Sequence, residues 1–251
     1  MSFYDFYYYK SHPDWLNNLF IRYNQNILFH LLSFFPDRKQ INLLELGPGK
    51  GYFYEACQKW DKKISYHAFD RNDLILKSLN IKSVFKGKAP NLPLFKKKFD
   101  IIFSAYLIEH LKSGEEVFEL IRKCKKNLSP GGLIVFLAPD ALSLKMEFWN
   151  MDYTHSFPTT KRNVAMAFYD NQLSDLNIHD YYDFTLWLTN KSNLWPICSF
   201  LIRITMIFYD YRLFNFLMLF SFRKTINRPE NWFYRLFCFT KVKNLMFIAR
   251  V

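Results

Sequence analysis

Short apolar segments alternate along the chain with stretches long enough to form helices. Alternation of this kind predicts an α/β fold in which successive strands are joined by helices. The segments that we expect to be strands are 43–46, 64–70, 99–105, 133–136, 171–187 and 242–251.

The first helix is predicted near the N-terminus. Residues 11–14 read Ser-His-Pro-Asp, and a proline with an acid in the first turn favours a helix start. We expect this helix to end near Pro36 and to pack on the fold. The apolar residues that recur in it at helical spacing are Trp15, Leu16, Leu19, Phe20, Tyr23, Ile27, Leu31 and Leu32.

The first strand runs into an acid and three alternating glycines, Glu45, Gly47, Gly49 and Gly51. Glycine permits a positive φ, and it lets a ligand approach backbone N–H groups that a Cβ would shield. The residues from Tyr52 onward can begin a helix that faces the same ligand. The third glycine comes one residue earlier than in the dinucleotide fingerprint, so the spacing argues against a cofactor that contains a pyrophosphate.

Three further motifs follow in order. The second strand ends at Asp70, where a Rossmann-like site places the acid that binds ribose hydroxyls. Residues 99–111 are expected to form a buried strand followed by a helix that carries Glu-His-Leu, and residues 128–136 are expected to form a Ser-Pro-Gly-Gly turn that enters a fifth strand.

Together, these motifs resemble those of the class I S-adenosylmethionine-dependent methyltransferases over residues 40–140. The resemblance implies an α/β, Rossmann-like three-layer sandwich with a mostly parallel seven-stranded sheet whose last strand is antiparallel. It also implies an enzyme that uses S-adenosylmethionine and releases S-adenosylhomocysteine. The cofactor contacts it implies are Glu45, Gly47, Pro48, Gly49, Gly51, Tyr52, Asp70, Arg71, Lys88, Ala89, Ser104, Ala105 and Tyr106.

One position departs from the family pattern. Lys88 stands where many relatives have an acid near the adenine. Adenine can still be held there by backbone groups and by a neighbouring side chain such as Asn91.

A length of 251 residues suits one main domain with an appended or inserted piece. We divide the chain into an N-terminal helical segment (1–36), a cofactor-binding core (37–188), a helical insertion (189–240) and a final core strand (241–251).

The insertion is rich in aromatic and aliphatic residues. Arg203, Asp210 and Arg212 interrupt its apolar runs before they reach the ~20 residues that a membrane-spanning helix needs. Two interpretations remain open. The helices lie in a membrane interface, or they cover the substrate site or form a dimer contact.

A net charge of +12 is compatible with polyanionic partners, but the lysine clusters fall at predicted loops and a helix end, which is typical of a solvated surface. The sequence Ser-Ala-Tyr-Leu at 104–107 replaces the Asn/Asp-Pro-Pro-Tyr loop of base-modifying relatives, which disfavours nucleic acid as the substrate. Scattered cysteines and a first decapeptide without signal-peptide features indicate a cytoplasmic protein, with peripheral contact at the inner face of the membrane as an option.

Residues 151–160 resemble a loop of methyltransferases encoded with surface-polysaccharide and glycolipid genes. His155 in this loop is a candidate general base, with a structural role as the alternative. Asp152, Tyr153 and Thr154 are the expected substrate contacts.

His110 and Asp140 are further catalytic candidates. His110 could shape the cofactor site or simply pack, whereas Asp140 could bind a sugar hydroxyl, orient His155 or cap the following segment. A Mg²⁺ site at Asp140 and Asp152 lacks a second close carboxylate pair, so we assign no metal.

The function expected from these features is O-methylation of a sugar hydroxyl on a glycan or lipid-linked glycan. A small-molecule methyltransferase of lipid or quinone type is the first alternative. A non-catalytic, methyltransferase-like, membrane-associated binding protein is the alternative of another class, although an intact glycine turn with Asp70 argues against it.

Overall fold

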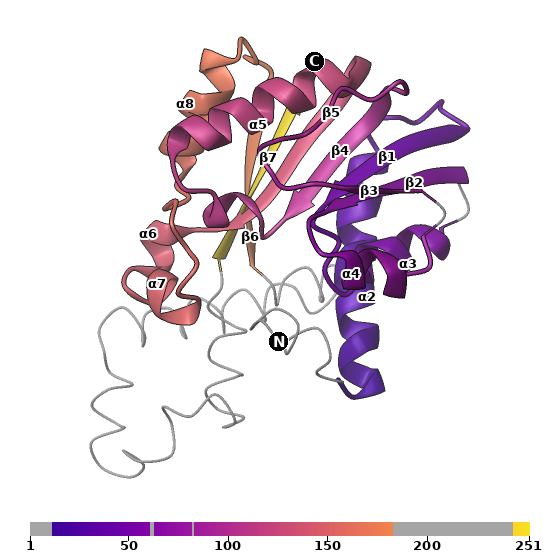
Figure 1. The fold of residues 1–251 in the computed structure, drawn as a ribbon, viewed down its shortest axis with the longest axis horizontal. Coiled ribbons are helices and arrows are strands. Elements are labelled where there is room, and N and C mark those ends of the chain that lie inside the picture. Colours follow the sequence, from indigo (N-terminus) through magenta and orange to yellow (C-terminus); the bar gives the residue numbers. More distant parts are fainter. Residues whose placement is uncertain (1–11, 61–62, 82, 183–242) are drawn as a thin grey trace, which may run out of the picture.

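The computed structural model describes residues 12–60, 63–81, 83–182 and 243–251. In this part of the chain, seven strands form one sheet in the order β3-β2-β1-β4-β5-β7-β6 (Figure 1). The strands are β1 (Gln40–Leu46), β2 (Lys63–Asp70), β3 (Val84–Lys86), β4 (Phe99–Ala105), β5 (Leu128–Pro139), β6 (Leu176–Tyr182) and β7 (Lys243–Arg250).

Strands β1 to β5 pair in parallel, and β7 is antiparallel to both β5 and β6. The predicted mostly parallel sheet with an antiparallel last strand is therefore confirmed. Its central strands are buried along most of their length, which explains why they read as continuous apolar runs in the sequence.

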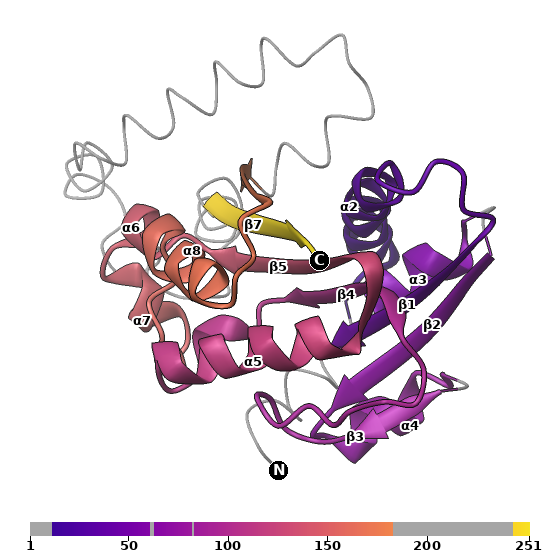
Figure 2. The ribbon, with the colours of Figure 1, turned by 90° about the horizontal axis from the view of Figure 1, so that it is seen from above.

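Helices cover both faces of the sheet (Figure 2). The helices are α2 (Asp14–Leu32), α3 (Tyr52–Gln58), α4 (Asp73–Ser78), the 3₁₀ turn η1 (Ile108–His110), α5 (Gly114–Asn127), α6 (Ala141–Leu144), α7 (Glu147–Met151) and α8 (Lys161–Asp170). Apolar residues of α2, α3 and α4 form one core with the sheet, and those of α5 and α8 form a second core on its other face. The result is the predicted three-layer sandwich.

The ends of two predicted helices differ from expectation. The N-terminal helix ends at Leu32 rather than near Pro36, and Pro13 lies at its N-cap. The helix expected after the fourth strand is only the single turn η1, because Leu111 returns to an extended conformation before α5 begins at Gly114.

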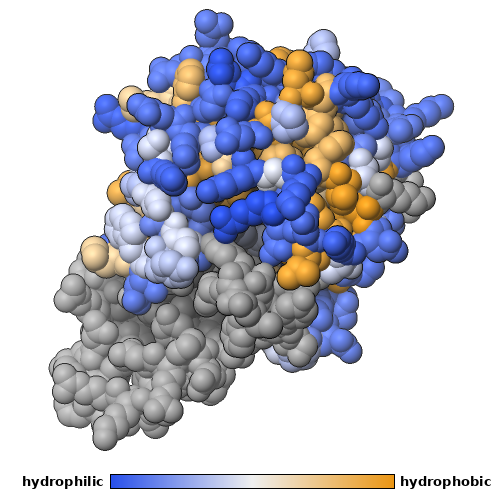
Figure 3. Space-filling model, viewed as in Figure 1, coloured by the Kyte–Doolittle hydropathy of each residue, from blue (hydrophilic) through white to orange (hydrophobic). Residues whose placement is uncertain are grey.

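The predicted insertion at 189–240 lies outside the described residues. Among those that are described, no helix combines the length and the apolar character required to cross a bilayer. Hydrophilic residues cover most of the described surface seen in Figure 3, and Lys96, Lys97 and Lys98 are exposed, as expected of solvated lysines.

The topology predicts where a ligand binds. The chain runs outward from β1 through β2 to β3, then crosses to β4 on the other side of β1. Ligands of open α/β sheets bind beyond the carboxyl ends of the strands at such a switch point. In this protein, that edge is formed by the segments after Leu46, Asp70, Ala105 and Pro139.

Candidate cofactor and acceptor site

Backbone hydrogen bonds hold the glycine turn after β1, one to strand β2 and one within the turn. Gly47 N–H donates to Phe69 O at 2.9 Å, and Gly51 N–H donates to Pro48 O at 2.9 Å. Gly47, Gly49 and Gly51 all have positive φ angles, of 74°, 51° and 79°. The turn therefore needs glycine for its conformation.

Two of these glycines differ in what surrounds them. A Cβ added at Gly51 would lie 2.4 Å from Leu79 Cδ2, so a side chain at this position would have to displace the Leu79 side chain at the end of α4. A Cβ added at Gly49 would meet nothing within 4 Å. The space beside Gly49 is available to a ligand that approaches the backbone.

Two acids lie beside the turn. Glu45 is buried in β1 and accepts a hydrogen bond from the Tyr66 hydroxyl. Burial, with a smaller contribution from nearby Asp70, raises the pKa of its carboxyl to about 8, although the hydrogen bond from Tyr66 acts to lower it. Asp70 ends β2 and accepts a hydrogen bond from Asn72 N at 2.8 Å. Burial raises the pKa of Asp70. The hydrogen bond from Asn72 and the positive charge of neighbouring Arg71 offset part of this increase.

Helix α2 reaches the same edge of the sheet. The Tyr52 hydroxyl donates to Asn17 Oδ1 at 2.8 Å, and the Tyr52 ring stacks on Phe20. The hydroxyl of Tyr106, a residue with a φ of 55°, lies 3.2 Å from that of Tyr23. The sequence predicted the helix but not these contacts, because periodicity identifies an apolar face and not the strand edge that the helix reaches.

The other predicted cofactor residues lie around this edge. Ser104 is buried, and its Oγ has no hydrogen-bond partner in the part of the chain that the structure describes; Ala105 is half-buried. Lys88 is exposed in the loop after β3, and its carbonyl accepts a hydrogen bond from Asn91 N at 2.8 Å. Ala89, which follows, packs against the core.

The predicted acceptor loop is joined to η1 by backbone hydrogen bonds. Glu109 O accepts from Ser156 N at 2.8 Å and from Phe157 N at 3.0 Å. These bonds bring His155 to His110, with ring centroids 5.0 Å apart. Two histidines proposed separately from the sequence therefore lie side by side.

Hydrogen bonds define the tautomer of each imidazole. The Thr154 hydroxyl donates to Asp152 Oδ1 at 2.7 Å, so it accepts from His110 Nδ1, which lies 2.8 Å away. His155 Nδ1 faces Phe148 O, which can only accept. Both rings thus carry the proton on Nδ1 and the lone pair on Nε2.

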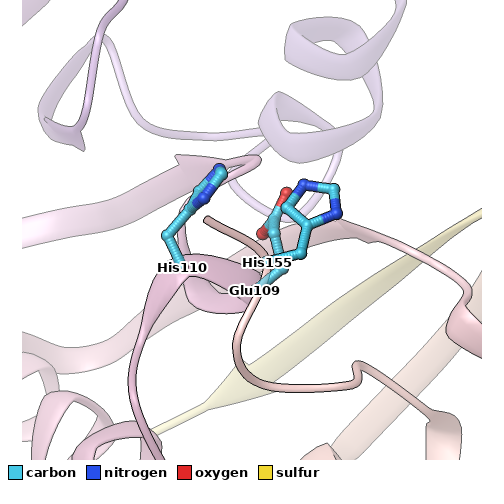
Figure 4. A group of neighbouring side chains, drawn as sticks. All are labelled: Glu109, His110 and His155. Carbon is cyan, nitrogen blue, oxygen red and sulfur yellow. The ribbon is translucent and has the colours of Figure 1, made fainter. Parts of the chain in front are cut away.

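Glu109 completes this group (Figure 4). Its side chain is buried, its Oε2 has no hydrogen-bond partner among the described residues, and burial raises the pKa of the carboxyl to about 8, with Asp152 adding to the shift. Burial and His155 lower the pKa of His110. The sequence analysis assigned a role to His110 and none to its neighbour Glu109. The sequence does not show that the Glu109 carboxyl group lies close to His155.

Asp140 caps the N-terminus of α6, which is one of the three roles expected for it from the sequence. Its carboxylate accepts from Leu142 N at 3.2 Å and Ser143 Oγ at 2.8 Å, which caps α6, and it pairs with Lys243 Nζ at 3.2 Å. Asp152 accepts from Thr154 instead, so these contacts give no support to a Mg²⁺ site formed by the two acids. Tyr153 is 82% exposed beside them.

Residues 20–176 match the family model described as a methyltransferase domain. The chain belongs to this family. It is an S-adenosylmethionine-dependent methyltransferase of the EC 2.1.1 type, as the glycine turn and the ordered motifs predicted.

Solved structures share the fold of this methyltransferase. A SAM-dependent methyltransferase from Archaeoglobus fulgidus aligns with a TM-score of 0.54 at 20% identity, covering 91% of this chain and 94% of that one. The Haemonchus contortus phospholethanolamine N-methyltransferase 2, in complex with phosphomonomethylethanolamine and S-adenosylhomocysteine, aligns with a TM-score of 0.55 at 16% identity, covering 91% and 52%. No curated protein matches the chain.

The residues present fit the cofactor. The methyltransferase has an open approach to backbone at Gly49 and an acid, Asp70, at the end of the adjacent strand. These are the groups that a nucleoside with a charged amino-acid tail requires.

Gly49→Ala should weaken binding of S-adenosylmethionine by at least about tenfold, since its methyl group would occupy the approach to the backbone and tenfold corresponds to only ~1.4 kcal/mol. Gly131→Ala is the matched control, because Gly131 also has a positive φ (73°) with nothing within 4 Å of an added Cβ, and its N–H is bonded to Val251 far from the turn. Both variants should lose similar stability in urea denaturation. Calorimetry that shows equal cofactor affinity in the two variants would contradict the assignment.

The free energy of unfolding of the cofactor-free protein should fall as the pH rises from about 5 to 8. The folded state holds the Glu45 proton more tightly than the unfolded state, so ionisation favours unfolding, by up to ~1.4 kcal/mol per pH unit for one group. Glu45→Gln should reduce this dependence of unfolding free energy on pH. Part of the dependence should remain in that variant, because burial also raises the pKa of Glu109 to about 8. Urea denaturation at several pH values tests this, with exposed Glu55→Gln as the control; an unchanged slope in Glu45→Gln would contradict it.

Proposed function

We propose that this methyltransferase methylates a hydroxyl group of a sugar, on a glycan or a lipid-linked glycan. The observation that supports this most is the contact of His155 Nδ1 with the Phe148 carbonyl, which assigns the lone pair to Nε2, beside His110. An alcohol must lose its proton when it accepts a methyl group, and an imidazole is suited to assist that loss near neutral pH.

Each group has a distinct role in this proposal. S-adenosylmethionine supplies an already activated methyl group, so the protein mainly has to hold the acceptor oxygen in line and keep water away. His155 assists removal of the acceptor proton. Asp152 binds the Thr154 hydroxyl, and that hydroxyl in turn fixes the orientation of the His110 ring. His110 then lines the side of the site opposite His155.

The surface around His155 suits a sugar acceptor that carries a lipid. Asp152 and Thr154 offer polar groups to sugar hydroxyls, and Tyr153 is an exposed ring that can stack on a sugar. Leu142, Met146 and Trp149 of the adjacent α6–α7 segment are also exposed, at 72%, 75% and 45%. Exposed apolar side chains beside the site favour a lipid-bearing acceptor, and we include in the proposal peripheral membrane contact by this segment and residues 189–240.

The acceptor proposal is tested by transfer of labelled methyl groups from S-adenosylmethionine into separated glycolipid, soluble sugar-nucleotide and RNA fractions. Label should enter the glycolipid or sugar fraction, and acidic liposomes should sediment the protein if the acceptor is lipid-linked. Label confined to RNA, or to lipids without sugar, would contradict the sugar assignment.

His155→Ala should lower the turnover number by roughly 10²–10⁴-fold, the usual size of a general acid–base effect, with little change in cofactor affinity. His179→Ala, which removes a histidine of β6 outside this site, is the control and should retain turnover. Near-normal turnover of His155→Ala at saturating acceptor would reduce His155 to a structural residue. If His155→Asn keeps most of the activity, the residue binds the acceptor and does not take its proton.

A further inference from the structure

Glu109, His110 and His155 bring three potential metal-ligand atoms within 4.8 Å of one another (Figure 4). We propose that these three side chains bind a divalent first-row transition-metal ion of the zinc type. The proposal rests on the proposed function only in placing the methyl acceptor beside this cluster.

The geometry is close to what such an ion requires. Bonds of ~2.0–2.1 Å in a tetrahedral site place neighbouring ligand atoms about 3.3 Å apart. Separations of at most 4.8 Å can be closed by rotation of side chains, because the backbones that carry them are already joined by the Glu109 carbonyl. No large movement of η1 or of the loop at 152–157 is needed.

The hydrogen bonds around the cluster orient the histidines as metal ligands. Histidine ligands usually donate their second ring N–H to a carbonyl, a carboxylate or another acceptor. His155 Nδ1 faces the Phe148 carbonyl, and His110 Nδ1 faces Thr154, whose hydroxyl is held by Asp152. In both rings Nε2 is the nitrogen that carries the lone pair.

Glu109 provides an independent indication of a positively charged ligand. Its side chain is about 1% exposed, and Oε2 lacks a hydrogen-bond partner among the described residues. A buried carboxyl oxygen without a hydrogen-bond partner is costly, and coordination of a cation is one of the few ways to compensate it. The carboxyl group lies beside the His155 ring, with His110 on its other side (Figure 4).

The ligand set selects the class of metal. Two imidazoles and one carboxylate suit zinc and its first-row neighbours, whereas Mg²⁺ and Ca²⁺ prefer oxygen ligands alone. Three protein ligands leave a coordination position open. An acceptor hydroxyl bound there would become more acidic, and His155 would then assist proton loss by holding the metal.

The test uses the full-length protein after dialysis against a chelator. Titration with Co²⁺ should produce a visible absorption band of a site with nitrogen ligands at one equivalent, and calorimetry should show one Zn²⁺ bound. Glu109→Gln and His155→Ala should weaken binding by more than the 10–100-fold typical of outer hydrogen-bond partners, and Thr154→Val should fall in that 10–100-fold range. His179→Ala removes the other close histidine pair, with His30, and should bind as the unmodified protein does.

Each outcome decides the proposal. An absent cobalt band, a band that Glu109→Gln leaves unchanged, or a band lost in His179→Ala would overturn it. Cofactor titration of each variant shows whether the substitution left the fold intact, and Thr154→Val, which leaves all three ligands in place, provides a second measurement if Glu109→Gln fails to fold. Methyl transfer to sugar that persists in the presence of chelator would overturn the metal's involvement and leave the proposed function intact. Metal binding without methyl transfer to sugar would support the metal site and contradict the proposed function.

Discussion

Parallel pairing of β1 with β2 on one side and β4 on the other is the constraint on which the site depends. Because these strands run in one direction, their carboxyl ends lie at one edge, and the chain reverses its order across β1. That places the glycine turn between Asp70 and the segment after Ala105. Burial of the strands on both faces by two helical layers fixes the register that maintains this arrangement.

The part of the site that could be predicted from the sequence is local. The positive φ angles of Gly47, Gly49 and Gly51 follow from their place between an apolar strand and a helix start, and Asp70 follows from ending the next strand. The sheet could be predicted for a similar reason, since buried parallel strands appear as short apolar runs and the ordered motifs resembled one family. The seventh strand was found in the same way, because its apolar run closes the chain.

The remainder depends on contacts between distant segments, which periodicity does not show. His110 and His155 were each proposed, but only the bonds from Ser156 and Phe157 to the Glu109 carbonyl bring their rings together. The Glu109 side chain is buried at the same place, although the sequence presents it as an ordinary acid in a helical turn. The distinction between Gly49 and Gly51 likewise depends on Leu79, a residue of another loop.

The central claim is that the carboxyl edge binds S-adenosylmethionine through the glycine turn and Asp70. Calorimetric titration of the cofactor into Asp70→Ala tests it most directly, with Asp73→Ala as the control because Asp73 is a nearby, partly exposed acid paired with Lys86. The account predicts binding weaker by about 1.5–3 kcal/mol in Asp70→Ala, the range for a hydrogen bond to a charged group, and unchanged binding in the control. Equal affinity in the two variants would contradict it.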